Sequence, residues 1–274
     1  TETWDRKLEN IFEIQDEISL HLADRLREQF GHMEYADHLA IPPTQNLSAY
    51  EHDLKARYHF NKSNAGDCQI SIEQWELALT LDEKLANAHV GLADAYGFMA
   101  ATQSMPYEDA WSKAIEHTHQ ALSLDEHSAG AYYQLANISF FTEFDFQGAF
   151  KHSSKAVDCD PTYPEGLQFL AFLHMVYGSM AIARQFLDRA LDRDPLNQET
   201  LFYQAYYRYR QGHLKESQSL LESLINRNPE NLPAIVTLSY IQLKLGKASE
   251  LLALLKSETG AKITPGDALG LECL

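Results

Sequence analysis

The chain has 274 residues, of which 45% are hydrophobic, and it contains only 13 glycines and 9 prolines, a composition that favours a helical protein over a loop-rich β-fold. Its 39 acidic and 22 basic side chains give a net charge of −17, which disfavours nucleic acid and anionic membranes as partners. The three cysteines are far apart, and neither a bilayer-spanning stretch nor a signal peptide is visible, so we expect a cytoplasmic protein with reduced thiols.

The beginning of the chain is expected to form one helix and a linker. Apolar side chains at four- and three-residue intervals predict an amphipathic helix over residues 1–31, with this face: Trp4, Leu8, Ile11, Gln15, Ile18 and Leu22. The face is either the seam of a coiled-coil dimer or a surface that packs on the protein itself. The pattern is short and places Gln15 and Arg25 on the seam, which favours packing over a dimer. Residues 32–47 are interpreted as a linker.

Three dipeptides mark a repeat further along the chain. Asp160-Pro161, Asp194-Pro195 and Asn228-Pro229 lie 34 residues apart, and each closes a stretch of apolar helix pattern. This period resembles that of the tetratricopeptide (TPR) repeat, a helix-turn-helix unit that stacks into a solenoid. The resemblance implies an all-α fold, a right-handed TPR superhelix of about six repeats over residues 48–260. Residues 261–274 are expected to begin a further hairpin.

The repeat pattern is clearest over residues 164–197. Its small and large positions are filled as a TPR unit requires by Leu167, Leu170, Ala171, Ala183, Leu187, Ala190 and Pro195. Gly178 falls where the first helix must end, a place that favours glycine. Earlier units are stretched by insertions, in the turn at residues 61–67 and around residues 99–106. Asp82 and Asp125 stand where Asp-Pro closes the later units, which predicts a turn at each.

The sequence contains no recognisable catalytic, nucleotide-binding or metal-binding motif. His117 and His119 are two residues apart on an expected helix, so their side chains point in different directions and cannot share a metal ion. Acidic pairs such as Asp125-Glu126 fall in expected turns. We therefore expect neither an enzyme nor a bound cofactor. An enzyme with its site in the insertion at residues 99–106 or in the groove is the disfavoured alternative.

The TPR resemblance also implies a binding surface, because repeat positions 2, 5, 9, 12 and 13 of each first helix line the concave face of such arrays. We expect a partner-binding groove that includes Asp94, Phe98, Tyr133, Asn137, Phe140, Phe141, Phe172, Met175, Phe202, Tyr206, Tyr209, Arg210 and Tyr240. Exposed aromatic side chains are typical binding anchors, so the expected partner is a protein or peptide segment, or the chain's own effector domain. The alternatives are that the superhelix closes on itself or that the tail fills the groove. Some TPR domains bind a terminal carboxylate through a clamp of Lys, Arg and Asn on the concave face. Such a clamp is disfavoured here, because Asn137 is suitably placed but the matching positions of the neighbouring repeats hold no Lys or Arg.

Three further segments carry a second resemblance: Trp4-Asp5-Arg6 with Gln15-Asp16-Glu17-Ile18, Ala49-Tyr50 with residues 56–60, and residues 144–149. They are similar to the junction, the first repeat and a middle repeat of bacterial regulators in which a TolB-like domain precedes a TPR region. Relatives carry a DNA-binding winged-helix or helix-turn-helix domain, or a class III adenylate cyclase domain, ahead of this region.

That second resemblance implies a regulatory module of a bacterial signalling or transcription-regulating protein, with the regulatory part of an adenylate cyclase as the alternative. The chain starts without Met and ends without a helix stop, so we expect it to be part of a longer protein. An RNA-binding helical repeat has a similar period and is disfavoured by the negative charge.

Overall fold

The computed structural model describes residues 43–247, 249 and 251, and every regular element within those ranges is an α-helix. The helices are α2 (Leu47–Phe60), α3 (Ala65–Leu81), α4 (Ala86–Ala101), α5 (Tyr107–Leu124), α6 (Ala129–Phe141), α7 (Phe146–Cys159), α8 (Pro164–Tyr177), α9 (Met180–Arg193), α10 (Gln198–Arg210), α11 (Leu214–Arg227) and α12 (Leu232–Lys244). The expected all-α fold is confirmed. The expected helix at 1–31, most of the linker at 32–47 and the expected hairpin at 261–274 lie outside the described residues.

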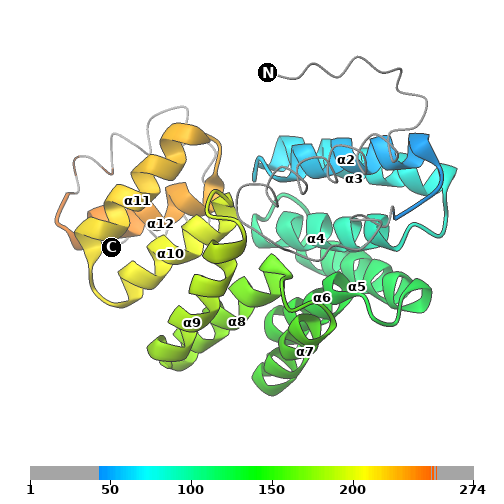
Figure 1. Cartoon of the computed structure of the whole chain (residues 1–274). Helices are drawn as coiled ribbons and strands as arrows, with labels where there is room; N and C mark the ends of the chain where they lie inside the picture. The colour runs from blue at the N-terminus through cyan, green and yellow to red at the C-terminus, as the bar shows by residue number, and fades with distance from the viewer. Residues whose placement is uncertain (1–42, 248, 250, 252–274) are drawn as a thin grey trace, which may run out of the picture.

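Consecutive helices pack as hairpins, α2 with α3, α4 with α5, α6 with α7, α8 with α9 and α10 with α11. Figure 1 shows these hairpins stacked beside one another in a curved array, the solenoid that the repeat predicts. Helix α12 begins a sixth unit, whose remainder is largely outside the described residues.

A side-chain oxygen closes the end of each described hairpin. The backbone N–H two residues further on donates to the carboxylate or amide Oδ1 of Asp82, Asp125, Asp160, Asp194 or Asn228. Each of these residues also ends the second helix of its hairpin. Because Asp and Asn side chains offer the backbone this local bond in place of a further helical turn, they recur at this position. The predicted turns at Asp82 and Asp125 are confirmed.

Small residues allow the helices to approach closely. Ala171, Ala183 and Ala190 of the α8–α9 hairpin are fully buried, as the repeat pattern predicts. At Gly91 of α4, a Cβ atom would lie 2.2 Å from the Trp75 ring, so only glycine fits there. Gly178 has φ of +88° and ends α8, which confirms its predicted role.

The expected insertion in the second unit is shared between helices and loop. Helices α4 and α5 have 16 and 18 residues, and residues 102–106 connect them. The first turn is shorter than expected, because α3 already begins at Ala65.

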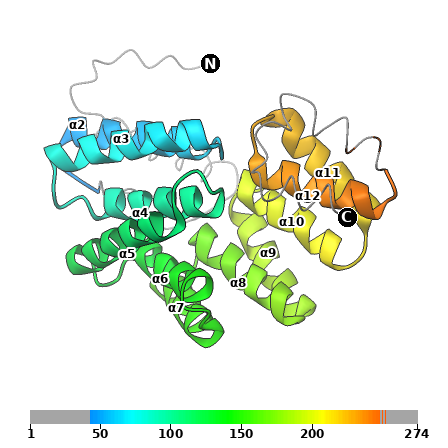
Figure 2. The same ribbon diagram turned by 180° about the vertical axis from the view of Figure 1, so that it is seen from behind.

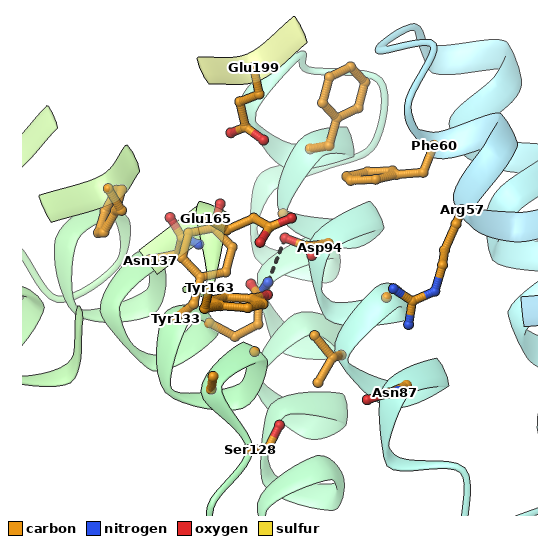
Figure 3. A pocket seen from close by; sticks show the side chains of 18 of the residues that line it. Arg57, Phe60, Asn87, Asp94, Ser128, Tyr133, Asn137, Tyr163, Glu165 and Glu199 are labelled. Carbon is orange, nitrogen blue, oxygen red and sulfur yellow. Dashed lines mark hydrogen bonds between the residues drawn. The ribbon is translucent and has the colours of Figure 1, made fainter. Parts of the chain in front are cut away.

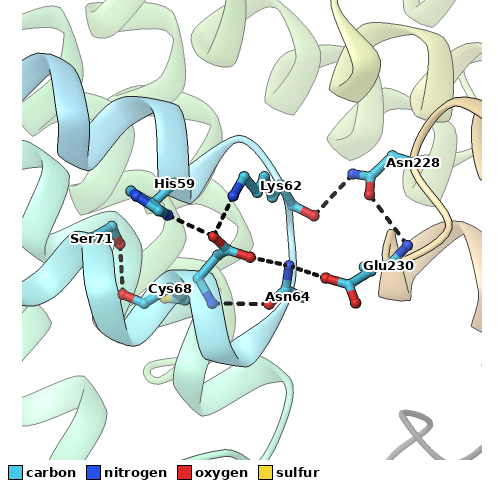
Figure 4. Close-up of polar contacts among 8 residues, drawn as sticks. His59, Lys62, Asn64, Cys68, Ser71, Asn228 and Glu230 are labelled. Atoms are coloured by element: carbon cyan, nitrogen blue, oxygen red, sulfur yellow. Dashed lines mark hydrogen bonds and ion pairs between the residues drawn. The ribbon is translucent and has the colours of Figure 1, made fainter.

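The two ends of the array meet. Three hydrogen bonds join the turn of the first hairpin to the start of α12 and the loop before it: Asn228 Nδ2 to the Lys62 carbonyl at 2.9 Å, Asn64 Nδ2 to Glu230 Oε2 at 3.0 Å, and the Leu232 N–H to the Ser63 carbonyl at 3.4 Å. Figure 4 shows the two side-chain bonds of this closure contact, and Figure 2 shows the first hairpin facing the last helices. The alternative in which the superhelix closes on itself is the arrangement observed.

Candidate binding lumen

The closed array surrounds a cavity of about 760 Å³, which we call the lumen. The first helices of the hairpins, α2, α4, α6, α8 and α10, supply most of its wall, together with Trp75 of α3, Trp111 of α5 and residues of the turns before α6 and α8. Its volume lies within the range of about 300–1,000 Å³ typical of ligand pockets. Figure 3 shows side chains from these helices converging on this space.

Eight of the expected groove residues line the lumen: Asp94, Phe98, Tyr133, Asn137, Phe141, Phe172, Phe202 and Tyr206. The expected register fits best in α4, where Asn87, Val90, Asp94, Gly97 and Phe98 all face the cavity. Tyr133 and Asn137 are almost fully buried, at 9% exposure each.

The expectation for Met175 is wrong. Its side chain is completely buried, in the same core cluster as Ala171, Ala183 and Leu187, and cannot contact a partner. Phe140 does not line the lumen either. Its ring packs behind the wall, with its centroid 5.3 Å from that of Phe172.

The remaining three expected residues lie beyond the cavity. Tyr209 packs in the core cluster between α10 and α12, with the Lys244 ammonium 4.7 Å from its ring centroid. Arg210 is exposed at the end of α10, and Tyr240 lies on α12, which supplies no residue to the lumen. Each hairpin is rotated relative to its neighbour. The same repeat positions therefore face the lumen in the earlier repeats and turn away from it near the C-terminal end of the array.

A further column of wall residues was missed at the sequence level. Gly91, Gln134, Phe169 and Tyr203 occupy repeat position 6, and all four line the lumen. Position 6 is four residues after position 2 and three before position 9, so helical spacing places it on the same face. The helical spacing alone could therefore have predicted that these four residues line the lumen. Tyr163, Phe60 and Arg57 also line the cavity and had no comparable signal.

Besides Asp125 and Asp160 of the hairpin-end turns, three acidic side chains face the lumen from helices of the second, fourth and fifth repeats: Asp94 of α4, Glu165 of α8 and Glu199 of α10. Burial raises the pKa of Asp94 to about 7, with a smaller contribution from Glu165. The Gln134 amide, whose Nε2 lies 2.5 Å from Asp94 Oδ1, opposes that rise by donating to the carboxylate. Figure 3 shows this bond and the three carboxyl groups around one space.

The other two carboxyl groups are enclosed in the same way. Burial raises the pKa of Glu199 to about 8, and the charges of Glu165 and Asp94 add to the effect. Burial also raises the pKa of Glu165, although a hydrogen bond from its own backbone N–H and the charge of Arg57 partly offset the rise. Glu165 Oε2 is buried and has no hydrogen-bond partner among the described residues. The lumen thus holds an acceptor for which the described part of the chain provides no donor.

The opposite wall carries one cationic side chain, which has its own anion. Arg57 of α2 donates from Nε to Asp53 Oδ2 at 2.9 Å, and Trp75 Nε1 donates to the other oxygen of Asp53, also at 2.9 Å. Asp53 is only 1% exposed, whereas the Arg57 side chain is 49% exposed, so packing fixes the carboxylate and the carboxylate holds the guanidinium. Arg57 is the only lysine or arginine among the described residues that line the lumen. The three acids facing it therefore leave the lumen with an excess of negative charge.

Aromatic rings form a continuous part of the wall across α8 and α10. The Phe172 centroid lies 5.7 Å from that of Phe169 and 6.2 Å from those of both Tyr203 and Tyr206. On the α6 side, Tyr133 packs edge-on against Phe169 at 5.9 Å. The wall can bury apolar groups and offer ring faces to a cation.

Other chemistries find little support in the described residues. No group of three or more His, Cys, Asp or Glu side chains there is arranged to hold a metal ion. Burial raises the pKa of Cys68 to about 12, which keeps this thiol protonated and unreactive. Within the same ranges, no helix combines the length and apolar character needed to cross a bilayer.

The stacked hairpins and their concave lumen define the class of protein: the chain has the fold of a TPR solenoid. Solved structures of similar fold include two TPR proteins. A tetratricopeptide repeat protein from Parabacteroides merdae aligns with a TM-score of 0.50 and 15% identity, over 82% of this chain and 84% of its own. The TPR protein TTC0263 from Thermus thermophilus aligns with a TM-score of 0.52 and 16% identity, over 70% of this chain and 99% of its own. No family model matches the sequence, and no curated protein matches it.

Proposed function

We propose that this chain is a protein-interaction module that holds a segment of a partner protein inside the lumen. The observation that carries the proposal is the lumen itself, a cavity of about 760 Å³ walled by aromatic and polar side chains from five repeats. Half-buried rings such as Phe98, Phe202 and Tyr206 offer apolar area at little entropic cost, because their neighbours already restrict them.

As part of the same proposal, the chain serves as a regulatory module in a bacterial signalling or transcription-regulating protein. The similarity of its junction and repeats to TolB-and-TPR regulators supports this context. The partner segment is then part of another protein or of the effector domain that such regulators carry, a transcription-regulating domain or an adenylate cyclase. Within the described repeats, the segment at residues 144–149 forms a helix start in which Asp145 accepts a bond from the Gly148 N–H.

The test is a selection of displayed random peptides against the chain, followed by binding measurements on the enriched peptides. Replacing Phe202 and Phe98 together by Ala enlarges the lumen and removes two rings from its wall. The affinity of these peptides should then fall at least tenfold. The matched control is Tyr177→Ala, which removes a ring that is 79% exposed and does not line the lumen. Circular dichroism checks that all variants stay helical.

The proposal fails if no peptide is enriched, or if the enriched peptides bind the double variant as tightly as the original chain. It also fails if Tyr177→Ala weakens them as much as the lumen variant does, because the binding surface would then lie outside the ring of helices.

A further inference from the structure

We propose that the lumen recognises a cationic side chain, an arginine of the partner segment, with Asp94, Glu165 and Glu199 as its counter-charges. This inference rests on the proposed function and names the chemistry of the segment that enters. Each step depends on a separate feature of the wall.

The first feature is the charge balance. Arg57 is bonded to Asp53, and its charge reaches Asp94 and Glu165 only from a distance, so none of Asp94, Glu165 and Glu199 forms an ion pair with a described lysine or arginine. Each of the three carboxyl groups lies close enough to another for their charges to interact. A cation placed among them would relieve this repulsion, whereas an anionic or neutral segment would not.

The second feature is an unpaired acceptor that is independent of the clustering. Glu165 Oε2 is buried against the lumen and accepts no hydrogen bond from a described residue. Leaving a buried carboxylate oxygen unpaired is costly, so the position calls for a donor from outside the wall. The group that satisfies it must carry N–H or O–H donors.

The third feature selects arginine among cations. Tyr163 and Tyr133 stand beside Glu165 in Figure 3, with their ring centroids 6.2 Å apart. A guanidinium group is planar, stacks on aromatic faces and donates several parallel N–H bonds, so it suits a site of carboxylates between rings. A bare metal ion does not suit it, because no described group of side chains has the arrangement of a metal site.

The experiment compares two capped pentapeptides, Gly-Leu-Arg-Leu-Gly and the same peptide with citrulline, which has the shape of arginine without its charge. Binding is followed by tryptophan fluorescence, because Trp75 and Trp111 line the lumen, and by calorimetry. We expect the arginine peptide to bind roughly tenfold or more tightly than the citrulline peptide, the range for hydrogen bonds to charged groups.

Glu165→Gln and Glu199→Gln should each remove most of that preference. Both variants keep the side-chain shape and remove a buried group that is costly to ionise, so they should fold at least as stably as the original chain. Glu73→Gln is the matched control, because Glu73 is exposed on α3 and does not line the lumen. The Glu73→Gln variant should keep the full preference for the arginine peptide over the citrulline peptide.

Equal binding of the two peptides would overturn the cation inference and leave the proposed function standing. The same conclusion would follow if neither peptide bound although the random selection had yielded peptides that bind in the lumen. If the selection yields none either, both proposals fail. Arginine amide, added alone, tests the source of the cation, because binding as tight as that of the pentapeptide would overturn a partner segment in favour of a small cationic ligand.

Discussion

Asn228 Nδ2 donates a hydrogen bond to the carbonyl of Lys62, and these two residues are separated by 166 positions in the chain. The bond joins the turn between α11 and α12 to the turn between α2 and α3, and so converts a row of repeats into a closed ring around the lumen. The first hairpin and α12 are otherwise ends of the described array, where helical repeats are usually least stable.

Removing this bond should loosen both ends of the array. Asn228→Asp keeps the oxygen that accepts from the Glu230 N–H but loses the donor to Lys62, so the free energy of unfolding should fall by about 1 kcal/mol. Hydrogen exchange of the backbone amides at residues 60–67 and 228–235 should accelerate. Asp194→Asn is the control, since it changes the same turn position in the preceding repeat. Unchanged exchange in both segments would show that the ring is held by other contacts.

Two glycines of α4 should respond oppositely to alanine. Gly91→Ala places a Cβ atom 2.2 Å from the Trp75 ring, which should lower the free energy of unfolding by about 1–3 kcal/mol. Gly97→Ala meets only the Trp111 ring at 3.5 Å, an ordinary contact, and should stabilise the helix by about 0.5–1 kcal/mol. Urea unfolding measures both. Equal effects would mean that the Trp75 ring moves aside freely.

Asp53 should be among the most sensitive polar positions of the first hairpin. Asp53→Ala leaves Trp75 Nε1 without its acceptor and Arg57 without its anion. The free energy of unfolding should therefore fall by roughly 3 kcal/mol. Asp53→Asn keeps an oxygen for Trp75 and should cost less. The control is Asp188→Asn, which breaks an exposed pair with Arg184 and should change stability by less than about 0.5 kcal/mol. Thermal unfolding ranks the three variants, and an Asp53→Ala chain as stable as the control would contradict the role given to this ion pair.

The chain without a ligand should lose stability as the pH rises. The pKa of Asp94 is raised from 3.8 to about 7 and that of Glu199 from 4.5 to about 8, so in these windows the folded chain holds protons that the unfolded chain has released. The contribution of these two groups to the free energy of unfolding is therefore fully present below their ordinary pKa values. It is lost as the pH rises through their raised pKa values. Urea midpoints at pH 5 and pH 8 measure the loss.

The double variant Asp94→Asn, Glu199→Gln should reduce this pH dependence, because neither amide ionises. Glu73→Gln serves as the control and should keep the original dependence. A double variant that loses as much stability between pH 5 and pH 8 as the original chain would assign the effect to other groups.

The helices and turns of the repeats were predictable from local sequence. The position of Asp160, Asp194 and Asn228 at the 34-residue period marked the hairpin ends, because an Asp or Asn oxygen closes each turn within three residues of chain. Gly178 marked a helix end for a similar reason, since its positive φ is a local requirement.

The wall of the lumen was predictable only in part. The register placed Asp94 and Gly97 correctly on the inner face, but Met175, which occupies the same repeat position as Gly97, is buried in the core. The helical spacing is the same in both repeats. The rotation between neighbouring hairpins is not encoded in any single repeat, and it decides whether a given position faces the axis or a neighbouring helix.

The sequence by itself therefore determined the repeat, its all-α class and the aromatic character of its first helices, because these depend on contacts within one hairpin. Only the tertiary structure decided that the array closes and that Asp94, Glu165 and Glu199 share one space. The closure depends on curvature summed over all the repeats, and the meeting of the three carboxyl groups depends on positions separated by whole hairpins.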